Sequence, residues 1–217
     1  MDQKEIYGLL AEKLGTAALG FSDEGVEAHA DVASESIVEA CFFLRDDERL
    51  AFNQLMCLSS IDWDGYDENG KGKSVKILGY TDDGQVETSD RVSEGDFGVA
   101  YSLYSHSKLH KFTIRVRVSR EKAAVPSVAQ VWSTADWHER EAWDLMGITF
   151  EGHPGLRRIL LEEDWEGHPL RKDYQMPDMW KNVPMTGQPY SNNPFPTPVV
   201  TPDPAPDQPA GDDPVEG

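Results

Sequence analysis

Cysteine is scarce in this sequence of 217 residues, which contains only Cys41 and Cys57. The two lie sixteen positions apart in apolar surroundings, with no C-x-x-C pair. A disulfide framework, an iron–sulfur cluster and a cysteine zinc site all need more cysteines or a closer spacing. The sequence therefore predicts two buried free thiols.

A long apolar run is also missing. No segment approaches the roughly 18 apolar residues that a membrane-spanning helix needs. Residues 1–6 contain no basic stretch leading into an apolar run, as a signal peptide would. We expect a soluble, intracellular chain with no direct membrane insertion.

Basic residues are few: 20 Lys and Arg stand against 39 Asp and Glu, which gives a formal net charge of −19. A nucleic-acid-binding protein needs a basic surface to displace counterions, and an acidic chain repels phosphate. The sequence therefore predicts no nucleic-acid partner and disfavours anionic lipid surfaces. Residues 101–181 are an exception, because they carry 12 acidic and 12 basic side chains.

Familiar catalytic motifs are incomplete. Residues 65–71 fit the G-x4-G-K skeleton of a phosphate loop, but Gly72 stands where that loop needs Ser or Thr. His138 begins an H-E-x-x-H pattern, yet Ala142 occupies the position of the second zinc ligand. Neither G-x-S-x-G nor a strand-linked G-x-G-x-x-G occurs. We expect no catalytic residue and no bound cofactor or metal in this chain.

One looser metal site remains as an alternative, because imidazole and carboxylate ligands suit first-row metals. The chain would then be a free-standing metal enzyme, with His138, Glu141, His153 and His168 as its ligands. The competing interpretation is structural: Gly and Pro flank both His153 and His168, as in repeated turns. We favour the turns.

Proline marks a boundary near the end of the chain. Eleven of the 14 prolines fall between Pro177 and Pro214, in sequence without apolar periodicity. We therefore expect an α+β domain over residues 1–181. Residues 182–217 would form an extended acidic tail that is partly disordered or wraps around a partner.

Apolar residues at helical spacing predict that helices dominate the first sixty residues. The expected helices cover residues 6–17, ending near Gly20; 37–44, after a Ser36–Glu39 capping box; and 50–58, begun by Asp46 or Asp47.

Strand-like alternation follows. Residues 75–80 are short and β-like, and apolar residues alternate over 97–103 and 112–118, joined by a hairpin through 105–108. The sequence predicts an α+β fold with helices packed on a mostly antiparallel sheet.

A further helix is expected over residues 134–146, closed by Gly147. The spacings of Ser127 with Gln130 and of Ser133 with Asp136 are those of capping boxes. Along this helix Asp136, Arg140 and Asp144 follow one another at i, i+4, which would also suit a self-paired solvent-exposed surface.

The most specific stretch runs from His138 to Leu160 and reads HEREAWDLMGITFEGHPGLRRIL; DWEGHPLRKDY follows at Asp164–Tyr174. These motifs closely resemble the C subunit of NADH-quinone oxidoreductase, the respiratory complex I, a family also represented in related hydrogenases. The similarity is dense over residues 126–174 and looser from about residue 35, and the Leu156–Leu160 segment is expected to be a strand. The Pro-rich extension beyond about Asn193 departs from the family pattern.

The resemblance implies a non-catalytic subunit of the peripheral arm, at the cytoplasmic face of the membrane. FMN, iron–sulfur clusters and quinone are then expected in partner subunits, above all the quinone-pocket (D-like) and iron–sulfur (B-like and I-like) subunits. The candidate interface is the signature itself: Glu139, Arg140, Glu141, Asp144, Gly147, Gly152, His153, Pro154, Arg157, Arg158, Gly167, His168, Pro169, Arg171, Lys172, Asp173 and Tyr174.

Two alternatives accompany this interpretation. The charges of the signature can instead form a polar lattice within the single chain that closes the domain. The same type of subunit would also suit an energy-converting hydrogenase or a dehydrogenase complex with another electron donor.

Overall fold

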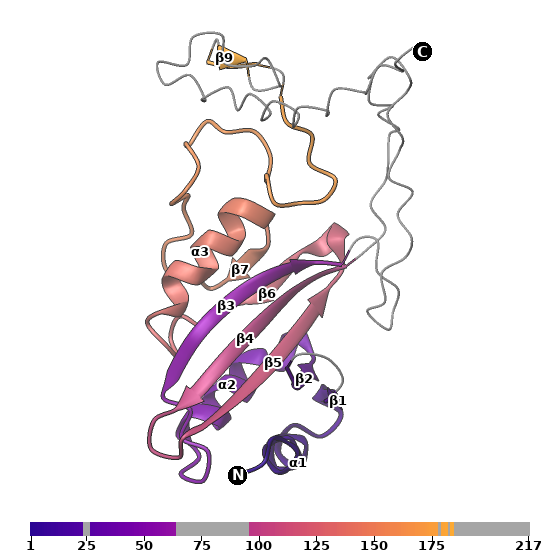
Figure 1. Cartoon of the computed structure of the whole chain (residues 1–217), viewed down its shortest axis with the longest axis vertical. Coiled ribbons are helices and arrows are strands. Elements are labelled where there is room, and N and C mark those ends of the chain that lie inside the picture. Colours follow the sequence, from indigo (N-terminus) through magenta and orange to yellow (C-terminus); the bar gives the residue numbers. More distant parts are fainter. Residues whose placement is uncertain (24–26, 64–95, 178, 182, 185–217) are drawn as a thin grey trace, which may run out of the picture. The chain divides into compact units, whose positions relative to one another are not determined.

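The computed structural model describes residues 1–23, 27–63, 96–177, 179–181 and 183–184 (Figure 1). The predicted loop at 65–71, the predicted strand at 75–80 and nearly all of the predicted tail lie outside these residues. The chain divides into two units, Met1–Gln175 and Met176–Gly217. In the second unit, β8 (Met179–Trp180) and β9 (Val183–Pro184) form an antiparallel pair.

The first unit is built on a five-stranded sheet. Its strands are β1 (Ala18–Ser22), β2 (His29–Val32), β3 (Gln54–Asp62), β4 (Phe97–Ser105) and β5 (His110–Val118). Their order is β1-β2-β5-β4-β3, and β2 with β5 is the parallel pair in an otherwise antiparallel sheet. A separate parallel pair joins β6 (Ala124–Pro126) to β7 (Thr149–Glu151).

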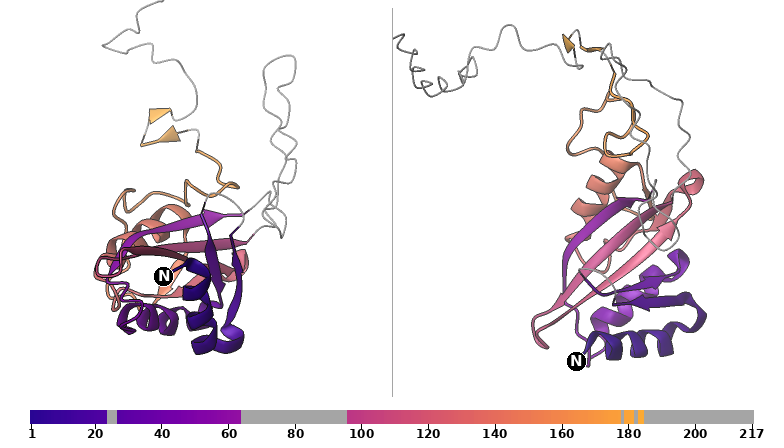
Figure 2. Two further views of the ribbon diagram at one scale, coloured as in Figure 1. Left: turned by 60° about the horizontal axis from the view of Figure 1, so that its bottom comes forward. Right: turned by 45° about the vertical axis from the view of Figure 1, so that its right-hand side comes forward.

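Three α-helices accompany the sheet among the described residues: α1 (Gln3–Leu14), α2 (Ile37–Asp46) and α3 (Ala135–Met146). Short 3-10 turns occur at Gly15–Ala17, Ser34–Ser36 and Arg120–Lys122. α1 and α2 lie by β1 and β2, whereas α3 lies along β3 (Figures 1 and 2). The α+β class with a mostly antiparallel sheet is confirmed.

One face of the sheet forms the core. In β5, Phe112, Ile114 and Val116 are buried, whereas the intervening Thr113 and Arg115 are only partly covered. The buried strand residues form one cluster with apolar residues of all three helices. Burial of each large apolar side chain contributes about 1.5–3 kcal/mol, so this face is the main source of stability.

The hairpin between β4 and β5 follows the sequence pattern. Ser105 pairs with His110, and the intervening residues turn with Leu109 at a positive φ of 52°. The apolar alternation of the two strands determines their register, because a slip of one residue would turn every apolar side chain outward.

The prediction of a helix over residues 50–58 is wrong, because Gln54–Asp62 is strand β3. A β-bulge between Leu55 and Cys57 shifts the alternation. Leu55 and Leu58 therefore face the same side although they are three residues apart, a spacing that imitates a helix. Upstream, the chain turns at Ala51, whose φ is 48°.

Smaller corrections concern helix ends and one thiol. α1 stops before Gly15, whose φ is 58°; a 3-10 turn follows over Gly15–Ala17, and β1 begins at Ala18. Ser36 precedes α2 without a side-chain capping bond, and Thr134 stands likewise before α3. Cys41 is buried as expected, but Cys57 is exposed on β3.

None of the described helices combines the length and the hydropathy needed to cross a bilayer.

Gly98 on β4 generates a stability prediction. A Cβ atom there would lie 1.9 Å from the Trp63 ring, so Gly98→Ala must displace that ring. We expect the free energy of unfolding to fall by about 1–3 kcal/mol, the usual cost of overpacking, measured by urea denaturation. The matched control is Gly8→Ala in α1, where space is open and helix propensity predicts a gain of up to about 1 kcal/mol. Equal effects of the two variants would contradict the steric explanation.

Candidate functional site

Helix α3 buries charged side chains, which is unusual for an amphipathic helix. Glu139 and Asp144 have no exposed surface, and Arg140 is 6% exposed. Lone buried charges are costly, so each needs hydrogen bonds or an ion pair. The contacts of these residues therefore define the candidate site.

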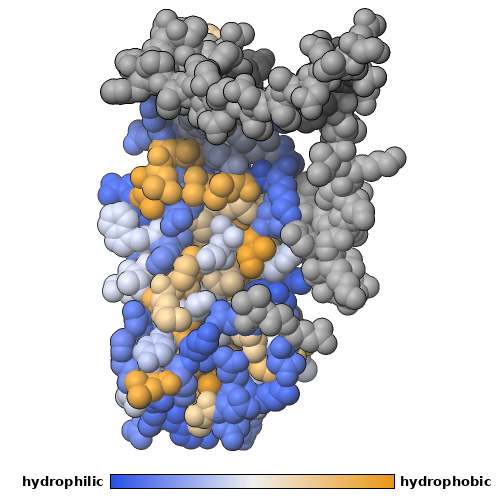
Figure 3. All heavy atoms as spheres, in the orientation of Figure 1, coloured by the Kyte–Doolittle hydropathy of each residue, from blue (hydrophilic) through white to orange (hydrophobic). Residues whose placement is uncertain are grey.

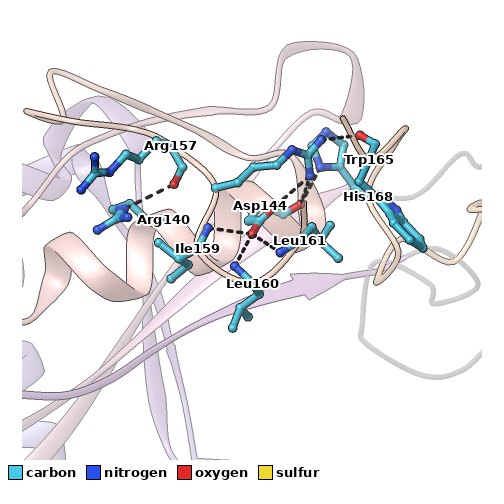
Figure 4. A network of polar contacts seen from close by, with 9 residues as sticks. Arg140, Asp144, Arg157, Ile159, Leu160, Leu161, Trp165 and His168 are labelled. Carbon is cyan, nitrogen blue, oxygen red and sulfur yellow. Dashed lines mark hydrogen bonds and ion pairs between the residues drawn. The ribbon is translucent and has the colours of Figure 1, made fainter. Parts of the chain in front are cut away.

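The Asp144 carboxylate organises the segment that follows β7. Its Oδ2 accepts hydrogen bonds from the backbone N–H groups of Ile159, Leu160 and Leu161 at 3.0, 2.8 and 3.0 Å (Figure 4). Its Oδ1 lies 2.8 Å from Nη1 of Arg158. Four donors thus converge on one buried carboxylate, and they hold residues 158–161 in a curl around it.

Burial and hydrogen bonding oppose each other at this carboxylate. Burial is the largest single effect on the pKa of Asp144 and raises it. The amides of Leu161, Leu160 and Ile159, together with Arg158, favour the ionised form and leave the pKa below its ordinary value. Asp144 is therefore ionised at neutral pH.

The C-terminal end of α3 is fully capped, since its last four carbonyl groups all accept hydrogen bonds. The donors are Gly147 N–H to Trp143 (2.8 Å), His168 Nδ1 to Asp144 (2.9 Å), Leu170 N–H to Leu145 (3.1 Å) and Arg171 Nε to Met146 (2.7 Å). The Arg171 guanidinium also suits the negative end of the helix dipole. The second Gly-His-Pro segment of the signature is therefore the cap of α3.

Glu139 holds the preceding loop. Its carboxylate accepts hydrogen bonds from the Ser127 hydroxyl at 2.5 Å and from the Val128 N–H at 2.7 Å. Burial, the largest effect, raises the pKa of Glu139, and these bonds together with nearby His153 offset that rise only in part. Glu139 thus anchors the loop before α3 to the helix. Its pKa in the folded protein stays above the ordinary value.

The first Gly-His-Pro segment is fixed to the beginning of α3. Nδ1 of His153 accepts a hydrogen bond from the Gly155 N–H at 3.0 Å, which leaves the proton on Nε2 in the neutral ring. Nε2 lies 2.9 Å from the Asp136 carboxylate and 3.9 Å from that of Glu139.

The end of the segment is tied to the sheet. Arg120 contacts the buried carboxylate of Asp62 and lies 3.2 Å from that of Asp173. Asp62 Oδ2 also accepts a hydrogen bond from the Lys172 N–H at 2.9 Å. Residues 153–173 are thereby held at both ends of α3 and at the end of β3.

The structure divides the predicted signature residues into groups. Those engaged in these contacts are Glu139, Asp144, Gly147, His153, Arg158, His168, Arg171, Lys172 and Asp173. Turns or positive φ angles account for Gly152, Pro154, Gly167 and Pro169, and the Tyr174 ring lies against Gly167. Arg140 is buried and donates to the Arg157 carbonyl, whereas Glu141 and Arg157 are exposed.

The predicted strand at Leu156–Leu160 is wrong, because these residues adopt an irregular path. Their alternation with charge suggested a strand, but the backbone donors of Ile159 and Leu160 bind the Asp144 carboxylate instead of a neighbouring strand.

Sequence reasoning missed Asp62, Arg120 and the pairing of Ser127 with Glu139. Ser127 was expected to cap a turn with Gln130, but it bonds Glu139 twelve residues away. No local spacing could signal these pairs, because the fold brings their members together.

The alternative metal site is not assembled. His153 is bound to Asp136, and Nδ1 of His168 faces the Asp144 carbonyl. His138 and Glu141 line a small pocket of about 240 Å³ beside β3. Within the described part of the chain, no group of three or more His, Cys, Asp or Glu residues is placed to hold a metal ion.

Comparison with known proteins now connects this site to a family. A sequence model described as the respiratory-chain NADH dehydrogenase 30 kDa subunit matches residues 30–179. The match includes all of α3 and the polar contacts around it, here called the polar lattice, which are those of Glu139, Asp144, His153, Arg158, His168 and Arg171. The chain belongs to this family.

Relatives named as the C subunit of NADH-quinone oxidoreductase agree. The protein from Chlorobium phaeobacteroides is 36% identical, over 82% of this chain and 91% of its own length. That from Chloroherpeton thalassium is also 36% identical over 82% of this chain, but the match spans 62% of its length. A solved structure, a trypsin-resistant fragment of Nqo5, matches 70% of this chain and 98% of its own with a TM-score of 0.47 and 25% identity.

The Asp144 cluster of this C-subunit family member predicts a pH-dependent loss of stability. Asp144→Asn removes the charge that four donors share, and we expect the free energy of unfolding to fall by about 3–5 kcal/mol at pH 7. Because the folded-state pKa lies below the ordinary 3.8, the ionised group contributes stability above about pH 4, and this contribution is lost as pH falls further. The difference in the free energy of unfolding between wild type and Asp144→Asn should therefore become smaller below pH 4, as measured by urea denaturation at a series of pH values.

The control is Asp46→Asn, which removes an exposed, ion-paired carboxylate and should change stability by less than about 1 kcal/mol. Equal losses in both variants, or an Asp144→Asn loss that does not change with pH, would contradict the role given to the carboxylate.

Gly147 and Gly152 allow a second prediction, because both have positive φ, at 70° and 79°. A Cβ on Gly147 would lie 2.3 Å from Nη2 of Arg171 and 2.6 Å from the His168 ring, whereas Gly152 faces open space. Both alanine variants carry the backbone strain, so the difference between them isolates the steric conflict. We expect Gly147→Ala to be less stable than Gly152→Ala by about 1–3 kcal/mol and to be cleaved faster by protease within residues 165–175. Identical unfolding midpoints and cleavage rates would show that the cap tolerates displacement.

Proposed function

We propose that this chain is a non-catalytic peripheral-arm subunit of a proton-translocating NADH:quinone oxidoreductase, and that it holds the quinone-site module in register. Its membership of the C-subunit family supports this assignment. The observation that carries the scaffolding role is the polar lattice around α3, because it fixes an irregular segment of about twenty residues without using a regular secondary structure.

A scaffold needs a surface whose shape does not change. The buried carboxylates Glu139, Asp144 and Asp62 each bind backbone N–H groups directly, so they hold the main chain in place. Hydrogen bonds to charged groups contribute about 1.5–3 kcal/mol each. The lattice therefore keeps residues 153–174 in one conformation on the helix.

Helix α3 and the segment that follows it leave apolar side chains exposed. Trp137, Leu160 and Leu170 are 60%, 61% and 58% exposed. On the face drawn in Figure 3, several hydrophobic residues in the upper part of the first unit lie close together. Tryptophan and arginine are frequent anchors of protein interfaces, so this rigid surface suits contact with a partner subunit.

The partners we propose are other peripheral-arm subunits, above all the quinone-pocket subunit and its iron–sulfur neighbours. FMN, iron–sulfur clusters and quinone belong to those partners in this proposal, and electrons pass from NADH to quinone through them. This chain acts by keeping positions fixed. Its location would be the cytoplasmic face of the membrane, through the complex.

Affinity purification of the tagged chain from gently solubilised native membranes tests this function. Quinone-site and iron–sulfur subunits should co-purify, with NADH:quinone activity in the same fraction. Hydrogenase subunits would instead assign the chain to an energy-converting hydrogenase, and a lone chain would overturn the proposal.

Arg140→Ala distinguishes assembly from chemistry. We expect the amount of assembled complex to fall several-fold, while NADH:quinone activity per assembled complex changes little, because the residue serves contact and not turnover. Quantification of the complex on native gels alongside activity measures both. Arg49→Ala is the control, since Arg49 is exposed and paired with Asp47. Normal assembly with strongly reduced turnover would indicate a direct catalytic role.

A further inference from the structure

Arg140 differs from the other buried charges of the lattice, because no acid neutralises it. Its Nε donates to the Arg157 carbonyl at 3.3 Å, and its guanidinium lies over the Trp137 ring, 4.6 Å from the centroid. Across the described ranges, no carboxylate lies within ion-pair distance of its nitrogens. A guanidinium with 6% of the residue exposed is normally paired.

The acids nearest along α3 are already engaged. Asp136 and Asp144 stand one turn before and after Arg140, where an i, i+4 partner would be expected. Asp136 binds His153, and Asp144 binds Arg158. Glu141 adjoins Arg140 in sequence, but successive helical side chains point in different directions. Asp136 and Asp144 are therefore both paired, whereas the Arg140 guanidinium has no carboxylate partner among the described residues.

A second arginine lies beside the first. Arg157 is exposed, and in the part of the chain that the structure describes its guanidinium makes no ion pair. In Figure 4 the Arg140 guanidinium lies by the Arg157 carbonyl that it contacts, and the Arg157 side chain extends away from Asp144. Two adjacent cations repel, and they remain unbalanced here in a chain whose net charge is −19.

We propose that Arg140 and Arg157 together bind a carboxylate side chain of another subunit of the assembly. This inference rests on the proposed function and names the chemistry of the contact. Planar guanidinium groups bind carboxylates with two parallel hydrogen bonds. The burial of Arg140 and the stacking of its guanidinium on Trp137 hold one of these groups in a fixed position.

A protein carboxylate fits better than a free anion because of Trp137. This ring is 60% exposed beside the two cations, and an exposed tryptophan gains from contact with a protein surface. Tryptophan next to arginine is a common composition of the residues that contribute most to protein association. The pair would then be shielded from water when the subunits meet, which strengthens the ionic contact.

Zero-length cross-linking in the intact complex tests the proposal. Arg157→Lys places a primary amine at the site, and a carbodiimide joins such an amine to a carboxylate in direct contact. We expect mass spectrometry to find residue 157 linked to an Asp or Glu of a different subunit. Lys108, exposed on the hairpin between β4 and β5, is the internal control and should lack that link. Links only within this chain, or none from residue 157, would overturn the inference.

Charge reversal gives an independent readout. Because Arg157 is exposed, Arg157→Glu should leave the fold intact, and we expect retention of the partner subunit in purified complex to fall at least tenfold. Lys108→Glu makes the same change of charge and should retain wild-type levels. Reversal of the cross-linked carboxylate to Lys should restore retention. Equal retention in Arg157→Glu and Lys108→Glu would reject the site, whereas a wild-type chain that captures no oxidoreductase subunits would reject the proposed function itself.

Discussion

The segment that follows β7 depends on one buried charge, the carboxylate of Asp144. Three consecutive backbone N–H groups and Arg158 bind it, so the path of residues 158–161 follows the position of a single side chain. A neutral amide could not accept four donors in this geometry. The conformation of the segment is therefore set by electrostatics, in a part of the chain where neither helix nor strand supplies hydrogen bonds.

Helix α3 transmits this constraint to the rest of the unit. Glu139 anchors the preceding loop, the carbonyl groups at the helix end bind residues 168–171, and Arg120 joins Asp62 of β3 to the end of the segment. Because each contact fixes main chain rather than side chain alone, displacement of one part must break bonds in another. This coupling supports the scaffolding role proposed above.

Most regular elements could be predicted from the sequence where their pattern is local. The helix that ends at Gly147 and the hairpin between β4 and β5 follow from periodicity and turn chemistry. β3 was missed because its bulge imitates helical spacing, and Leu156–Leu160 because its donors bind a side chain fourteen or more residues away in sequence. The same limit applies to the candidate site. Most of its residues could be located from the signature, but the pairing of their charges could not be predicted, because it depends on the fold.

Those pairings divide one sequence signature into two physical classes. Asp144 and Glu139 are buried and saturated with donors from their own chain, so a partner subunit gains nothing by approaching them. Arg140 and Arg157 carry charge that the described lattice leaves unmatched, and Trp137 adds exposed apolar surface beside them. Under the proposed contact, substitutions in the first class are expected to act on folding and those in the second on association. One run of charged residues can therefore serve the fold and, in the contact proposed above, a partner as well, because its acids are paired within the chain whereas Arg140 and Arg157 have no carboxylate partner among the described residues.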